Sequence, residues 1–72
     1  MSIERGQHVV VVDAFGAELS RIALGEPVLG EDFPVVWVCR PEVWEQAQRE
    51  GHDPEGVPWP LEDVRVADRE PA

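Results

Sequence analysis

The side chains best suited to act as a thiolate nucleophile or as nitrogen and sulfur ligands of a metal are one cysteine, Cys39, and two histidines, His8 and His52. A cysteine–histidine pair can form a thiolate nucleophile, and the same groups with carboxylates can bind zinc. The sequence has no C-x-x-C and no H-x-x-x-H spacing, and Cys39 lies in an apolar run where a small buried residue is expected. We therefore predict no catalytic residue, no metal site and no cofactor. A small metal- or cysteine-dependent enzyme remains the second alternative.

Carboxylates dominate the charge, because fifteen acidic residues accompany only six basic ones, all arginine, for a net charge of −9. Two acidic pairs, Glu31 with Asp32 and Glu62 with Asp63, are adjacent in sequence. Adjacent acids point in different directions, and acid–base catalysis needs a pocket that separates their pKa values. The negative field repels phosphates, so we predict no direct binding of nucleic acid and no docking on a membrane. The first alternative function is an acidic inhibitor that imitates nucleic acid and binds a basic protein.

Three tryptophans are the most informative residues. Trp37 lies within a β-prone run, so we expect it in the core, and we expect Trp44 to pack a helix onto the sheet. Trp59 stands between Pro58 and Pro60, which restrict the backbone around it. Two interpretations of Trp59 stay open: it fills one end of the fold, or it presents an exposed ring to a partner, since tryptophan is frequent at interface hot spots.

The sequence thus predicts a non-enzymatic protein-binding or assembly module with an aromatic and acidic surface. Such a surface suits a protein partner with a basic or proline-containing segment, because arginine stacks on indole and proline packs flat against it. The predicted partner-binding residues are Trp59, Trp44, Pro58, Pro60, Glu55, Glu62 and Asp63.

The cysteine count and the apolar runs indicate in which compartment of the cell the protein is expected. One cysteine cannot form an internal disulfide, and the first residues lack the basic-then-apolar pattern of a signal peptide. The longest apolar runs, 9–12 and 35–39, are far shorter than the roughly 20 residues of a membrane helix. These features predict a cytoplasmic protein.

The elements that must position these residues follow from local patterns. β-Branched runs predict strands, whereas segments dense in Gly and Pro predict loops. Pro41 suits a first helical turn and Gly51 suits a helix end, so a helix is expected between them. The predicted strands are 8–13, 18–24, 35–40 and 61–66, the helix is 41–50, and the loops are 25–34, with a brief extended piece at 27–29, and 51–60.

Seventy-two residues allow one domain. We predict a polar lead at 1–7, a single domain at 8–66 and a frayed tail at 67–72. Hairpins followed by a late closing strand favour a mainly β fold, a small barrel of four to five antiparallel strands with the helix inserted before the last one. Two strands that are apolar on both faces need more cover than one short helix gives, so a symmetric homodimer is a further hypothesis.

The layout resembles the SH3-like small barrels, in which a G-x-x-V-x-V strand pairs with a short final strand; the matching pieces are 6–11 and 61–66. The chain is also similar to small acidic proteins of high-GC actinobacteria and their phages. That similarity lies in Trp44 and in the segments 32–38 (DFPVVWV), 56–60 (GVPWP) and 62–64 (EDV), and it implies no activity.

Overall fold

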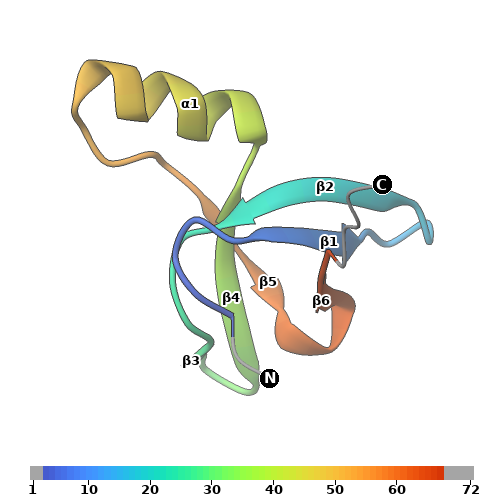
Figure 1. Ribbon diagram of the computed structural model, residues 1–72. Helices are drawn as coiled ribbons and strands as arrows, with labels where there is room; N and C mark the ends of the chain where they lie inside the picture. The colour runs from blue at the N-terminus through green and yellow to red at the C-terminus, as the bar shows by residue number, and fades with distance from the viewer. Residues whose placement is uncertain (1–2, 68–72) are drawn as a thin grey trace.

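The computed structural model describes residues 3–67 and contains six strands, one α-helix and one 3₁₀ turn. All strand pairs are antiparallel, and the sheet order is β3-β4-β2-β1-β6, with β5 on the other side of β4. The sheet curls into a small SH3-like barrel with the helix set off at one end (Figure 1). The elements are β1 (His8–Val12), β2 (Glu18–Ala23), β3 (Val28–Leu29), β4 (Pro34–Cys39), α1 (Pro41–Glu50), β5 (Val57–Pro60), η1 (Leu61–Asp63) and β6 (Val64–Val66).

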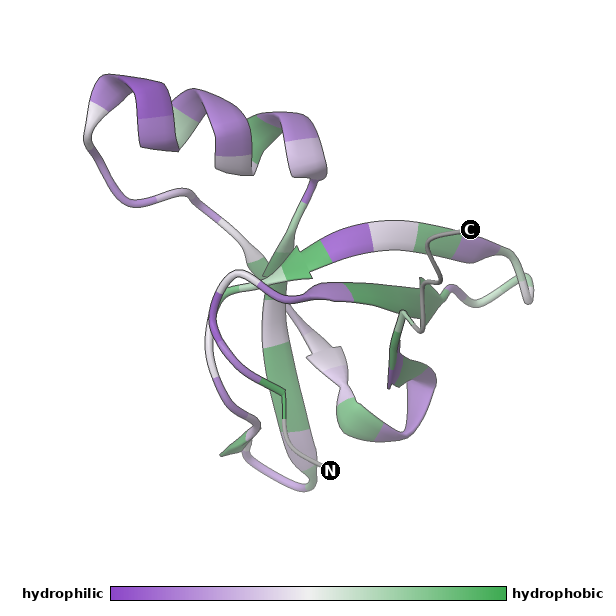
Figure 2. Ribbon diagram, viewed as in Figure 1, coloured by the Kyte–Doolittle hydropathy of each residue, from purple (hydrophilic) through white to green (hydrophobic). Residues whose placement is uncertain are grey.

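The core follows from the alternation of side chains along the strands. Val9 and Val11 of β1 and Val36 and Val38 of β4 are almost completely buried on the inner face of the sheet. Figure 2 shows the apolar colour along β1 and β4, and mainly polar colour along α1. Burying each valine stabilises the fold by about 1.5–3 kcal/mol. The predicted fold class, a small mainly β barrel with one helix, is therefore confirmed.

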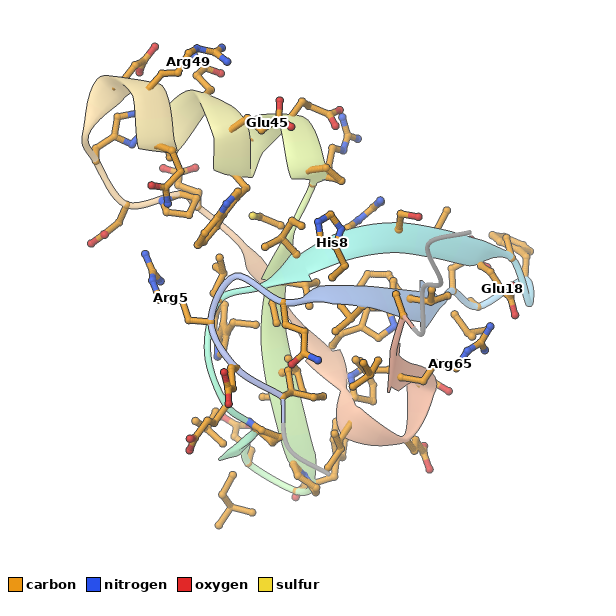
Figure 3. All side chains as sticks on the ribbon, viewed as in Figure 1. Arg5, His8, Glu18, Glu45, Arg49 and Arg65 are labelled. Atoms are coloured by element: carbon orange, nitrogen blue, oxygen red, sulfur yellow. The ribbon has the colours of Figure 1, made fainter. Side chains whose placement is uncertain are left out.

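The hairpin between β1 and β2 is held by Asp13. Its Oδ1 atom accepts hydrogen bonds from the backbone N–H groups of Phe15 (2.8 Å) and Ala17 (2.9 Å). Gly16 adopts φ 83°, a conformation that disfavours other residues. This turn fixes the register in which His8 lies opposite Ile22 and Val12 lies opposite Glu18. Across β1, the Arg65 guanidinium of β6 pairs with the Glu18 carboxylate of β2 at 2.9 Å (Figure 3).

The segment 51–60 differs from the prediction, because its second half is a strand and not a loop. In β5, Trp59 lies opposite Val36 and Pro58 lies opposite Trp37. The Leu24 N–H donates to the Trp37 carbonyl (2.7 Å), so the backbone of Trp37 faces β2 and that of Val36 faces β5. By the same alternation, the prolines of β5 turn their missing N–H groups toward the free edge. Proline is tolerated at such an edge and blocks pairing with another chain.

The closing segment was predicted as one strand and is divided in the structure. The 3₁₀ turn η1 comes first, and β6 then pairs with β1, with Val64 opposite Val11 and Val66 opposite Val9. Leu61 and both valines pack against the core, as expected for inward residues. The number of strands is six rather than four to five, because β5 forms in a segment predicted as a loop and the short β3 is also a strand.

The helix α1 has the predicted ends. Pro41 occupies its first turn, and Gly51 ends it in the left-handed conformation with its N–H donating to the Ala47 carbonyl (2.8 Å). Ala47 is buried, while Val43 and Trp44 are half-buried.

The attachment of α1 to the barrel runs through the N-terminal segment. The Trp44 indole lies against Gly6, and the Arg5 guanidinium lies 5.3 Å from the centre of the indole. Arg5 also donates to the Leu24 carbonyl (3.2 Å) and lies 3.6 Å from the Asp53 carboxylate. One arginine therefore contacts the helix, the end of β2 and the loop that follows the helix.

Within the predicted polar lead 1–7, Ile3 is buried and belongs to the core, and the Gly6 N–H donates to the Ala23 carbonyl (2.8 Å). The lead is therefore part of the barrel from Ile3 onward. Of the predicted tail, 68–72 lies outside the described residues. No helix within residues 3–67 is both long and apolar enough to cross a membrane.

Gly56 is expected to be intolerant of any side chain. A Cβ atom there would lie 2.5 Å from the Val38 carbonyl oxygen and 2.5 Å from Leu24 Cδ1. Because the backbone of β4 must move to relieve the clash, we expect Gly56→Ala to lower the free energy of unfolding by about 1–3 kcal/mol. Gly25→Ala is the matched control, since a Cβ there meets nothing within 4 Å. Equal chemical denaturation midpoints for the two variants would contradict this packing.

Candidate binding surface

Trp37 lies on the outer face of β4 and is 44% exposed, so its predicted place in the core is wrong. On the same face, its neighbours at alternate positions, Val35 and Cys39, are both buried. A turn covers Val35, because a Cβ at Gly30 would lie only 3.3 Å from Val35 Cγ1. Trp37 is thus the one uncovered side chain among three on this face of β4.

Further exposed hydrophobic residues surround Trp37. Val28 is 48% exposed, Leu29 is 84% exposed and Phe33 is 51% exposed, and all three lie in β3 or the turn that follows it. All three line one hollow together with Trp37, and a cluster of exposed apolar side chains typically marks a contact surface.

Two hollows meet at Trp37 and Val28, and we call them together the Trp37 groove. The first has a volume of about 630 Å³ and lies between the start of β3 and the loop before β5. The second has a volume of about 470 Å³ and lies along the turn between β3 and β4. The first is lined by 24–28, Trp37, Pro54 and Gly56, and the second by 28–33, Val35, Trp37 and Pro58.

Every charged residue that lines the groove is acidic. Glu26 lines the first hollow, and Glu31 and Asp32 line the second. Prolines 27, 54 and 58 stiffen the walls, because their backbones have little freedom left to lose on binding. The groove therefore combines a rigid apolar floor with a negative rim.

Trp59 has a different environment. Its side chain is half-buried and packs against the core, and its indole N–H donates to the Val12 carbonyl at 3.0 Å. This bond links β5 to β1 across the barrel. The exposed part of Trp59 lines a hollow beside the start of α1. That hollow is also lined by Glu55, Val43, Arg21 and Arg40.

The structure does not gather the seven predicted partner-binding residues in one hollow. Trp59 and Glu55 line the same hollow, whereas Trp44 packs against Gly6 of the N-terminal segment. Pro60 and Glu62 line a small hollow beside Phe33, and Asp63 is half-buried in η1. Of the seven, Pro58 alone lines the Trp37 groove. Sequence reasoning missed Trp37, although the alternation of Pro58 and Pro60 is typical of an edge strand and could have placed β5 beside it.

The nucleophile and metal candidates come from three different parts of the chain, with His8 in β1, Cys39 in β4 and His52 just after α1. Burial raises the pKa of the Cys39 thiol above its ordinary value, against the opposing effects of Arg5 and Arg21. A protonated thiol is the reverse of what a nucleophilic cysteine needs. Within residues 3–67, no three His, Cys, Asp or Glu side chains are close enough together to hold a metal ion.

Comparison of the chain with protein-family models, with curated proteins and with solved structures found no match. The similarity to acidic proteins of high-GC actinobacteria and phages therefore stays a prediction.

His52 forms a small titrating cluster at the end of α1, outside the groove. Its Nδ1 atom lies 3.1 Å from the Asp53 carbonyl oxygen, and its Nε2 atom lies 2.8 Å from a Glu50 carboxylate oxygen. Both neighbours accept hydrogen bonds from the imidazolium, so the Asp53 carbonyl and then Glu50 raise the pKa of His52. Hydrogen bonds from Gln46 and His52 lower the pKa of Glu50.

These shifts predict a window of pH in which the cluster stabilises the fold. The contribution of His52 is present below its unfolded pKa of about 6.5 and is lost as the pH rises through the raised folded value. The contribution of Glu50 is lost as the pH falls through its lowered value. In an NMR titration, Glu50→Gln should lower the His52 midpoint only in part, because the Asp53 carbonyl remains. A wild-type midpoint at or below about 6.5 would contradict the assigned hydrogen bonds.

Proposed function

We propose that this protein is a non-enzymatic protein-binding module and that the Trp37 groove is its binding surface. The observation that carries the proposal is the exposure of Trp37 on a face of β4 where Val35 and Cys39 are buried. An uncovered indole in the middle of a strand leaves a large apolar area in water, and burial of that area by a partner is favourable.

The rigidity of the groove supports the same function. Trp37 projects from a paired strand, with Val28 and Pro58 on the strands beside it. A ring on a paired strand loses little entropy when a partner covers it, which is why rigid aromatic residues so often dominate binding energy.

The partner that fits this surface is a protein with an extended segment that is basic or contains proline. The rim is acidic, so a basic segment is attracted to it and a nucleic acid backbone is repelled. Proline packs flat against an exposed indole. A homodimer fits this surface less well. Each copy carries the same carboxylates and a net charge of −9, so the two copies repel each other.

The proposal is tested by panning a random peptide display library against the protein and mapping the enriched peptide by NMR. Each tryptophan supplies one indole N–H signal, so the three signals report separately on the groove, the barrel and the helix. We expect the Trp37 indole and the backbone of 26–33 to shift, and the Trp59 indole to stay in place. Failure to enrich any peptide, or shifts confined to Trp59 and Glu55, would overturn the proposal.

A further inference from the structure

The carboxylates along the Trp37 groove gather at one of its ends. Glu31 and Asp32 are adjacent in the turn between β3 and β4 and line the second hollow, whereas the first hollow contains a single carboxylate, Glu26. The first hollow instead has two prolines, Pro27 and Pro54. The groove therefore has a doubly acidic end at the turn and a proline-lined end beside the loop that precedes β5.

The acidic end also contains aromatic rings. Phe33 follows Asp32 directly and is half exposed, and Trp37 lines the same hollow. A guanidinium can pair with a carboxylate and stack on an aromatic ring at the same time, a combination that lysine meets less well. Within residues 3–67, no arginine lines either hollow, so the ligand has to supply this cation.

A second copy of the chain is a poor source of the cation. Arg5 is bound to the Leu24 carbonyl and lies beside Asp53, Arg21 donates to the Ser20 carbonyl, and Arg65 is paired with Glu18. Three of the six arginines are thus already engaged within the chain. A second copy would also bring its own net charge of −9. Charge complementarity therefore points to a different, cationic protein segment.

We infer that the Trp37 groove binds an extended segment in one direction, with an arginine side chain at Glu31 and Asp32 and proline or apolar side chains beside Pro27 and Pro54. This inference rests on the proposed function, because it names the chemistry of the occupant of the same surface. It adds a fixed direction of the bound segment, which the apolar floor alone does not impose.

Two small probes test this direction by NMR: N-acetyl-arginine methylamide and N-acetyl-proline methylamide. The arginine probe should shift the backbone amides of Glu31–Phe33, and the proline probe should shift those of residues 25, 26, 28 and 56. The variant Glu31→Gln with Asp32→Asn removes the charge of the turn. It should weaken binding of the arginine probe by about two- to tenfold and leave binding of the proline probe unchanged. The matched control is Glu42→Gln with Glu45→Gln on α1, which removes the same charge at exposed positions outside the groove.

The outcomes separate this inference from the proposed function. Three outcomes would overturn the inferred binding direction. The two charge variants could weaken binding of the arginine probe equally, the arginine probe could shift residues 25–28, or neither probe could cause a shift. If peptides from the display library still bind at Trp37 in any of these cases, the proposed function stands without it. If no peptide binds at Trp37, the proposed function is overturned, and the inferred direction is overturned with it.

Discussion

Trp59→Ala is expected to unfold much of the protein at room temperature or to lower its melting temperature severely. The substitution removes an indole that packs against the core and donates to the Val12 carbonyl. Such a change in a core typically costs about 3–5 kcal/mol. A domain of this size has a total stability of roughly 4–11 kcal/mol, so the loss is a large fraction of the whole. Circular dichroism during thermal and chemical denaturation measures it.

Two further variants separate packing from hydrogen bonding at this position. Trp59→Phe keeps most of the ring but loses the N–H donor, so we expect a loss of about 1 kcal/mol and a folded protein. Trp44→Ala removes a half-buried indole on α1 and should cost less than Trp59→Ala, because Trp44 packs against Gly6 of the N-terminal segment and not against the core. A Trp59→Ala variant that melts like the wild type and no longer binds its peptide would show that Trp59 is the partner-binding residue.

Trp37→Ala is expected to have the opposite signature, with binding lost and stability kept. An aromatic hot spot contributes 2 kcal/mol or more, so the dissociation constant of the selected peptide should rise by about 30-fold or more. Stability should change little, because Trp37 points outward and the valines on either side of it, Val36 and Val38, stay buried. Isothermal titration calorimetry, which does not rely on tryptophan fluorescence, measures the dissociation constant. Thermal melting measures the stability.

Phe15→Ala is the matched control for the loss of an exposed aromatic ring. Phe15 is 94% exposed in the turn between β1 and β2 and does not line the groove. The variant should bind the selected peptide as well as the wild type does. If Phe15→Ala and Trp37→Ala weaken binding equally, the effect is nonspecific and Trp37 is not the anchor.

The sequence by itself determined the elements whose signals are local. The helix α1 begins at Pro41 and ends before Gly51 as predicted, because a proline that lacks an N–H and a glycine that accepts a positive φ act within one turn. The strands β1 and β2 and the short extended piece at β3 were also predicted, since β-branched runs and turn residues act on neighbouring positions. From these local elements, the mainly β barrel followed with its late closing strand.

Only the tertiary structure decided which tryptophan is covered. Trp37 and Trp59 both lie in β-prone or proline-flanked runs, and nothing near them in sequence says which face becomes the inside. The register of β4 with β5 places Trp59 opposite the buried Val36 and Pro58 opposite Trp37, so Trp59 turns inward and Trp37 turns outward. Side chains in a strand alternate with a period of two, so a single register between strands distant in sequence exchanges core and surface. For this reason the anchor predicted from sequence was Trp59, whereas the groove is built around Trp37.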